Sequence, residues 1–173
     1  MSNDKKPSSN KSQTRIITEL PFGLSGRVFR SPMPFSDYDP ERLAFQEIKT
    51  QHVHTIVILT ETFEYLQYTG EDLKAFYQEE GFEVLHLPIM DFGVPNREEF
   101  EKLLEQVLEN VLHGKNVAVH CLAGLGRTGL LMACLAKRVF GYTGNEAVLW
   151  LRSYIPGAVQ NEEQVRFIVK DAP

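Results

Sequence analysis

The chain has 173 residues, of which 43% are apolar and 24% are charged, and its formal net charge is -5. That length suits one domain with a sizeable core, and the acidic balance argues against bulk attraction to nucleic acid. No apolar run approaches the roughly 18 residues that a membrane-spanning helix needs. We therefore expect a globular monomer with neither a nucleic-acid partner nor a membrane partner.

The beginning of the chain is polar and rich in Ser, Asn and Lys, with no apolar signal core. We interpret residues 1–14 as a disordered tail and residues 15–173 as a single domain. Two cysteines, Cys121 and Cys134, do not make a disulfide framework. Because free thiols fit a reducing setting, we expect a cytoplasmic, intracellular protein.

The hydrophobic pattern predicts strands that alternate with helices. The expected strands cover 26–30, 55–59, 82–87 and 117–120. The expected helices cover 41–50, 72–80, 97–112, 128–140, 145–153 and 162–170, and we place Phe63 and Tyr65 on a loop. This alternation favours an α/β fold, a three-layer α/β/α arrangement with a central, mostly parallel sheet. In such sheets ligands bind at the carboxyl ends of the strands.

The run from His120 to Gly129, HCLAGLGRTG, carries the strongest chemical signal because it joins an expected strand to an expected helix. Backbone N–H groups of a tight, Gly-containing loop converge on an anion, and the helix that follows adds its positive end. Arg127 supplies a planar fork that binds two phosphate oxygens, although a structural ion pair is the alternative. We expect the loop to contact a substrate phosphate through Leu122, Ala123, Gly124, Leu125 and Gly126.

Cys121 stands at the mouth of this positive loop, which favours its thiolate near neutral pH. A thiolate that faces a phosphate ester is a nucleophile, whereas the alternative is a buried, inert thiol. Thr128 lies at the start of the expected helix. Its hydroxyl could bond the thiolate and make it a better leaving group, or it could be an ordinary hydroxyl of a helix start.

The full string resembles the phosphate-binding loop of the cysteine-dependent protein tyrosine and dual-specificity phosphatases. Residues 87–95 are similar to the general-acid loop of that family, and residues 157–167 to its glutamine loop. Among subfamilies, the chain is most similar to the kinase-associated phosphatases and the dual-specificity phosphatases of mitotic exit. The resemblance implies the protein tyrosine phosphatase-like fold and a two-step reaction through a phosphocysteine, with no metal and no cofactor. It also implies phosphoproteins as substrates.

The resemblance assigns roles to residues outside that loop. Asp91, between an apolar strand and a Phe-Gly-Val-Pro stretch, is the candidate general acid, although a turn or capping aspartate is the alternative. Asp72 is a reserve acid, but its place at a helix start makes capping the expected role. Gln160 is implied to position the hydrolytic water and Gln164 to contact the substrate, unless both are solvated amides on one helix face. His120 is implied to orient the loop by hydrogen bonds and to tune Cys121.

These features predict hydrolysis of phosphate monoesters on phosphoproteins, both on phosphotyrosine and on phosphoserine or phosphothreonine. One alternative is a phosphoinositide or small-molecule phosphatase with the same mechanism. Neutral Leu122 and Leu125 replace the lysines of lipid-phosphatase relatives and disfavour a highly phosphorylated headgroup. Another alternative is a catalytically silent phosphoprotein-binding module. A third is a thiol redox or sulfur-transfer enzyme, which would need neither Asp91 nor Gln160.

Overall fold

The computed structural model describes residues 15–170. Within that range five strands form one sheet in the order β1-β2-β5-β3-β4. The strands are β1 (Thr18–Leu20), β2 (Val28–Ser31), β3 (Thr55–Ile58), β4 (Glu83–His86) and β5 (Val117–His120). Strands β2, β5, β3 and β4 run parallel, and β1 is antiparallel to β2 at one edge. The predicted mostly parallel sheet is confirmed.

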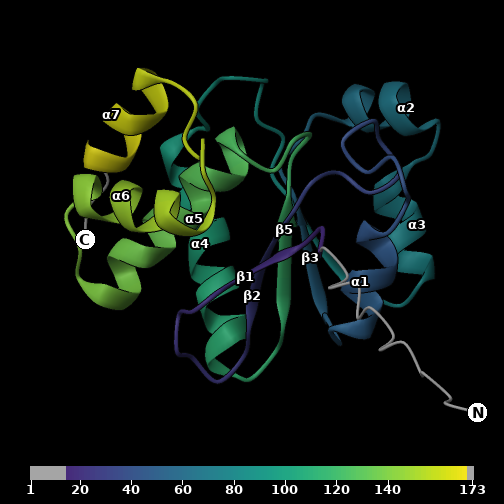
Figure 1. Ribbon diagram of the computed structural model, residues 1–173, viewed down its shortest axis with the longest axis horizontal. Coiled ribbons are helices and arrows are strands. Elements are labelled where there is room, and N and C mark those ends of the chain that lie inside the picture. Colours follow the sequence, from purple (N-terminus) through teal and green to yellow (C-terminus); the bar gives the residue numbers. More distant parts are fainter. Residues whose placement is uncertain (1–14, 171–173) are drawn as a thin grey trace, which may run out of the picture.

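Seven helices of the described range cover the two faces of the sheet. They are α1 (Ala44–Thr50), α2 (Thr62–Thr69), α3 (Leu73–Glu79), α4 (Arg97–Leu112), α5 (Gly126–Phe140), α6 (Gly144–Tyr154) and α7 (Glu162–Lys170). Figure 1 shows α1, α2 and α3 on one side of the sheet and α4 to α7 on the other. The three-layer α/β/α arrangement predicted from the sequence is therefore confirmed.

Alternating residues of the central strands supply two separate cores. Val57 and Val119 pack with the helices of the α4–α7 side, and Ile56 and Ala118 pack with α1 and α3. Every residue of β3 and β5 is buried, because both strands have a neighbouring strand on each side and helices on each face. This double burial explains why these strands are apolar and rich in β-branched residues.

Two elements of the structure are absent from the sequence predictions. Strand β1 was not predicted, because three residues are too few to show a period. The prediction that Phe63 and Tyr65 lie on a loop is wrong, since both belong to α2. Only two residues of that helix are buried, so it presents no apolar stripe, and a Glu61–Glu64 capping box begins it without Ser or Thr.

The bounds predicted for α4, β5 and α7 agree with the structure. Helix α3 begins after Asp72, whose carboxylate accepts a hydrogen bond from the backbone N–H of Ala75. The capping role expected for Asp72 is confirmed. Within residues 15–170 there is no helix of the length and apolarity that would let it cross a membrane.

The register of the parallel strands sets the position of the site. Ser31 of β2 pairs with His120 of β5, and His120 pairs in turn with Ile58 of β3. The carboxyl ends of three adjacent strands are therefore level, and Cys121 follows immediately after the central one. Segments that leave β2, β3 and β4 can reach the loop that begins at Cys121 from three sides.

Candidate active site

The loop of residues 121–127 leads from β5 into α5, and four of its carbonyl groups accept hydrogen bonds from neighbouring segments. Leu122 O accepts a hydrogen bond from Met33 N at 2.8 Å. Ala123 O and Gly124 O accept from the Arg30 guanidinium at 2.6 and 2.9 Å. Leu125 O accepts from Val159 N at 3.1 Å. Each carbonyl oxygen from 122 to 125 is thus engaged by a neighbouring segment.

The backbone N–H groups of the same loop have no hydrogen-bond acceptor in the described part of the chain. Among residues 15–170, no acceptor takes a hydrogen bond from the backbone N–H groups of residues 122–128. Gly124 adopts a φ of 71° and α5 begins directly at Gly126, which together create a compact turn onto a helix N-terminus. Consecutive free N–H groups at a helix start form a site that suits an anion.

Arg127, the last residue of this loop, is buried and its guanidinium is bound by a carboxylate. Its two terminal nitrogens contact the two oxygens of Glu64 at 2.7 and 3.0 Å, and Nη1 also donates to Ile89 O at 2.9 Å. Burial lowers the pKa of Arg127, but the Glu64 hydrogen bonds and the charges of Cys121, Glu64 and Asp91 more than offset it and raise that pKa. The guanidinium therefore stays charged, with its fork held in one orientation.

Glu64 is a site residue that the sequence analysis missed. It is buried on α2, and its Oε2 accepts from the Glu61 backbone N–H at 2.9 Å as well as from Arg127. The available signal was the pair of glutamates spaced by three residues at 61 and 64, which begins α2. Nothing in the sequence links that pair to Arg127, which lies 63 positions further along the chain.

Asp91 lies on the connection from β4 to α4 and reaches the same arginine. Its Oδ1 is 3.0 Å from Arg127 Nη2, and its side chain is 48% exposed. Asn161 Nδ2 donates to Phe92 O at 2.7 Å, and Gln164 Nε2 donates to Gly93 O at 3.3 Å. The start of α7 therefore ties down the segment that carries Asp91.

The two glutamines meet the 121–127 loop at Gly126. A Cβ at this position would lie 2.5 Å from Gln160 Oε1 and 3.1 Å from Gln164 Nε2, so a larger residue would displace the ends of the two amide side chains. Gln164 is fully buried and its Oε1 accepts from Gln160 N at 2.9 Å, whereas Gln160 is exposed. The alternative of two solvated amides is wrong for Gln164.

Val159 precedes these glutamines with a φ of 60°, which is rare for a β-branched residue. It is 1% exposed, and its N–H donates to Leu125 O. The segment before α7 therefore carries local backbone strain where it docks on the 121–127 loop, a feature typical of functional sites.

His120 is buried under the loop and bonded on both ring nitrogens. Nδ1 lies 3.1 Å from Cys121 O, and Nε2 lies 3.2 Å from the Tyr77 hydroxyl. Burial lowers the pKa of His120 to about 4, so the ring is neutral. Burial and the charge of Asp39 raise the pKa of Tyr77, which keeps its phenol protonated. A neutral ring then donates from Nδ1 to Cys121 O and accepts the Tyr77 proton at Nε2.

Cys121 and Thr128 lie at the two ends of the loop. Cys121 is 3% exposed, at the end of a fully buried strand. Thr128 is fully buried, and its hydroxyl has no hydrogen-bond partner in the described part of the chain. The structure therefore shows neither a Thr128 bond to the Cys121 sulfur nor a capping bond.

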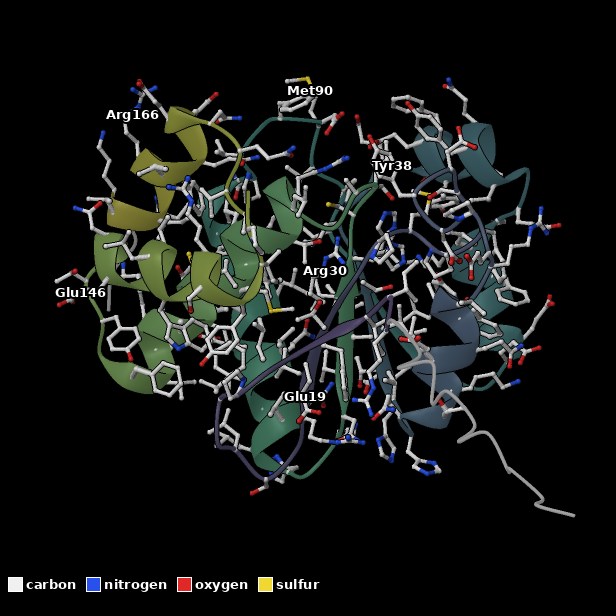
Figure 2. The ribbon with its side chains drawn as sticks, in the orientation of Figure 1. Glu19, Arg30, Tyr38, Met90, Glu146 and Arg166 are labelled. Carbon is white, nitrogen blue, oxygen red and sulfur yellow. The ribbon has the colours of Figure 1, made fainter. Side chains whose placement is uncertain are left out.

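Figure 2 labels three residues around this region. Met90, next to Asp91, lies at the top of the view, and Tyr38, on the segment that follows β2, lies below it and to the right. The partly buried Arg30 is near the middle of the view. Met90 and Tyr38 are 68% and 53% exposed. Large exposed side chains thus border the end of the sheet at which Cys121 lies.

Comparison with known proteins identifies the family. A family model described as "Polymorphic toxin system, DSP-PTPase phosphatase" matches residues 36–139, well over half of the chain. Dual specificity protein phosphatase CDC14B of Mus musculus is 32% identical over 159 residues, which cover 91% of this chain and 30% of that protein. Tyrosine-protein phosphatase cdc-14 of Caenorhabditis elegans is 41% identical over 90 residues, which cover 52% of this chain and 12% of that protein. The chain thus spans less than a third of the length of these relatives.

Solved structures agree with this assignment. Kinase associated phosphatase, with its catalytic-site cysteine replaced by serine, superimposes with a TM-score of 0.80 at 23% identity, over 90% of this chain and 93% of that one, and shows the fold. Tk-PTP in its active form superimposes with a TM-score of 0.69 at 33% identity, over 84% of this chain and 92% of that one. The chain therefore belongs to the DSP-PTPase family of tyrosine and dual-specificity phosphatases.

Proposed function

We propose that this chain hydrolyses phosphate monoesters on phosphoproteins through a phosphocysteine intermediate. The observation that carries the proposal is the 121–127 loop, whose carbonyls are bonded outward while the N–H groups of residues 122–128 have no acceptor in the described range. Those N–H groups, the Arg127 fork and the Cys121 sulfur belong to one turn. A phosphate held there would lie against the nucleophile.

In the first step the Cys121 thiolate attacks phosphorus in line, and the bond from phosphorus to the substrate oxygen breaks. Asp91 gives its proton to that oxygen, which leaves as an alcohol or phenol. In the second step a water positioned by Gln160 attacks the phosphocysteine, with Gln164 holding Gln160 and the Asp91 segment in place. Asp91 takes the proton of that water, and the Cys121 thiolate departs with release of inorganic phosphate.

Substrate binding would change the contacts of Arg127. Its Nη2 donates to Glu64 and forms an ion pair with Asp91 at 3.0 Å, while its Nη1 donates to Glu64 and to Ile89 O. Glu64 and Ile89 O are buried, whereas the Asp91 side chain is half exposed. A phosphate oxygen would therefore displace Asp91 from Arg127, which frees the carboxyl group to meet the leaving oxygen.

Phosphoproteins fit the surroundings better than polyphosphorylated lipids do. The segments at the carboxyl edge of the sheet, residues 32–43, 59–61, 87–96, 122–126 and 155–161, contain no Lys and a single Arg, Arg42. One guanidinium and a set of N–H groups match one phosphate, whereas additional phosphates would need additional cations. Both phosphotyrosine and phosphoserine or phosphothreonine are proposed, with a reducing, cytoplasmic setting that keeps Cys121 as a thiol.

The test is turnover of an aryl phosphate, of phosphopeptides and of phosphoinositides with EDTA present. Wild type should hydrolyse the aryl phosphate and the phosphopeptides, Cys121→Ser should be inactive, and Asp91→Ala should lose most activity on phosphothreonine. Phosphocysteine should accumulate in Gln160→Ala. Preferred hydrolysis of phosphoinositides would assign lipid substrates instead. Tight phosphopeptide binding by an inactive wild-type protein would establish a binding module.

A further inference from the structure

Arg30, on β2, is the main contact between the sheet and the outer side of the 121–127 loop. Its Nε donates to Gly124 O at 2.9 Å and its Nη2 to Ala123 O at 2.6 Å, while Nη1 reaches Ile16 O at 3.3 Å. The side chain is partly buried and is labelled near the middle of the view in Figure 2. The reaction proposed above assigns it no part.

The two loop contacts of Arg30 determine which way the peptide groups face. In a peptide unit the carbonyl and the N–H point in opposite directions, so a carbonyl held toward β2 turns the following N–H away from it. The two carbonyls that Arg30 holds belong to the peptides that carry the N–H groups of Gly124 and Leu125. Both N–H groups are among those without an acceptor in the described range.

The loop also lies very close to this part of β2. A Cβ on Gly124 would be 2.3 Å from Ser31 O and 2.7 Å from Arg30 Nε. Close backbone approach with a φ of 71° leaves the loop little freedom to rotate as long as the guanidinium stays in place. The Arg30 guanidinium therefore binds the loop at Gly124, where the loop and β2 approach most closely.

We propose that Arg30 is a positioning residue for the reaction, and this rests on the proposed function. It holds the Ala123 and Gly124 carbonyls outward, so that the N–H groups of residues 124 and 125 face the substrate phosphate. Arg30 touches neither substrate nor leaving group, and it acts through the loop.

The test compares Arg30→Met, Arg30→Lys and Arg27→Met. Arg27 is the matched control because it lies on the segment that leads into the same strand and bonds Gln51 through two nitrogens, far from the loop carbonyls. Two quantities are measured on folded protein: tungstate affinity by calorimetry and kcat/KM for an aryl phosphate. Tungstate affinity needs no turnover, so it remains informative if the proposed function fails.

Arg30→Met should weaken tungstate binding and kcat/KM by about 10²-fold, because misplaced N–H groups no longer match the anion. Arg30→Lys should not recover tungstate affinity, since an ammonium group lacks the fork. Arg27→Met should change neither quantity.

Unchanged tungstate affinity in either folded Arg30 variant would overturn the proposal. So would an equal loss in Arg27→Met, because the effect would then be a general consequence of altering this segment. If Arg30→Met does not fold, Arg30→Lys decides alone: full tungstate affinity in that variant would contradict the role of the fork.

Discussion

In the proposed reaction, Asp91 and the substrate phosphate compete for one nitrogen of Arg127. The Asp91 carboxylate lies 3.0 Å from Nη2 and carries the same sign of charge as a phosphate. The carboxylate should therefore weaken anion binding, while the proposed mechanism needs it for the chemical step. These two effects have opposite signs and can be separated by one substitution.

Asp91→Asn should bind tungstate about tenfold more tightly than wild type, because a gain of roughly 1.4 kcal/mol is expected on removal of the competing charge. Turnover of an alkyl phosphate should fall by about 10²- to 10⁴-fold, as for loss of a general acid. Calorimetry and initial rates measure the two effects. Asp72→Asn, at the α3 cap, is the control and should leave both unchanged. Equal tungstate affinity in Asp91→Asn and wild type would contradict the competition.

His120 makes stability depend on pH. Its pKa in the folded protein is about 4, below the ordinary value of 6.5, so the unfolded chain binds more protons between these values. The contribution of His120 to the free energy of unfolding is therefore fully present above about pH 6.5 and is lost as the pH falls toward 4. The loss is about 3 kcal/mol, at 1.36 kcal/mol per pKa unit.

Urea unfolding between pH 4 and pH 7 checks this effect of His120. His120→Asn should lose less stability on acidification than wild type, whatever its stability at pH 7. His113→Asn, which alters an exposed histidine at the end of α4, should follow the wild-type slope. A slope for His120→Asn equal to that of wild type would show that the buried ring does not carry the dependence.

At the scale of elements, two helices on opposite sides of the sheet bring carboxylates to Arg127. Helix α2 supplies Glu64 directly, and α7 acts at a distance through Asn161 and Gln164, which hold Phe92 O and Gly93 O. Asn161 also accepts from Gln164 N at 2.9 Å, as an N-cap does. The chain thus uses the start of α7 to position the Asp91 segment.

Asn161→Ala should slow turnover of phosphothreonine peptides by about tenfold, because Asp91 is then less well placed. An aryl phosphate with an acidic phenol needs less proton donation and should be hydrolysed at nearly the wild-type rate. The ratio of the two kcat/KM values is the measurement, with the exposed neighbour Glu162→Ala as control. Equal losses on both substrates would indicate that Asn161 does not act through Asp91.

At the scale of the whole molecule, anion binding should stabilise the fold. The site joins loops after β2, β4 and β5 with the starts of α2 and α7, so a bound oxyanion links both helical layers. At a tungstate concentration a hundred times its Kd, the gain is about 2.7 kcal/mol, which raises the Tm by about 5–10 °C for a domain of this size. Scanning calorimetry should show this shift for wild type and Cys121→Ser. Arg127→Met should lose the shift, and a shift retained by that variant would place the anion elsewhere.

The fold and the centre of the site were readable from sequence because their signals are local. The strands β3 and β5 are continuous apolar runs, α4 and α7 are amphipathic over their full length, and the loop from Cys121 to Arg127 is one contiguous string. Short β1 and mostly exposed α2 lack such patterns and were missed. Gln164 shows the limit of prediction from sequence, because the spacing of the two glutamines alone could not distinguish a solvated amide from a fully buried one.

The sequence by itself determined the family and the layer order, and it predicted the residues that would bind a phosphate, since each depends on neighbouring positions. Only the tertiary structure decided which distant groups serve that loop. Glu64 meets Arg127 across 63 positions, and Arg30 meets the loop carbonyls across 93 and 94. Such pairings follow from the parallel order of β2, β5 and β3, which aligns their ends, and no periodicity along the chain encodes that alignment.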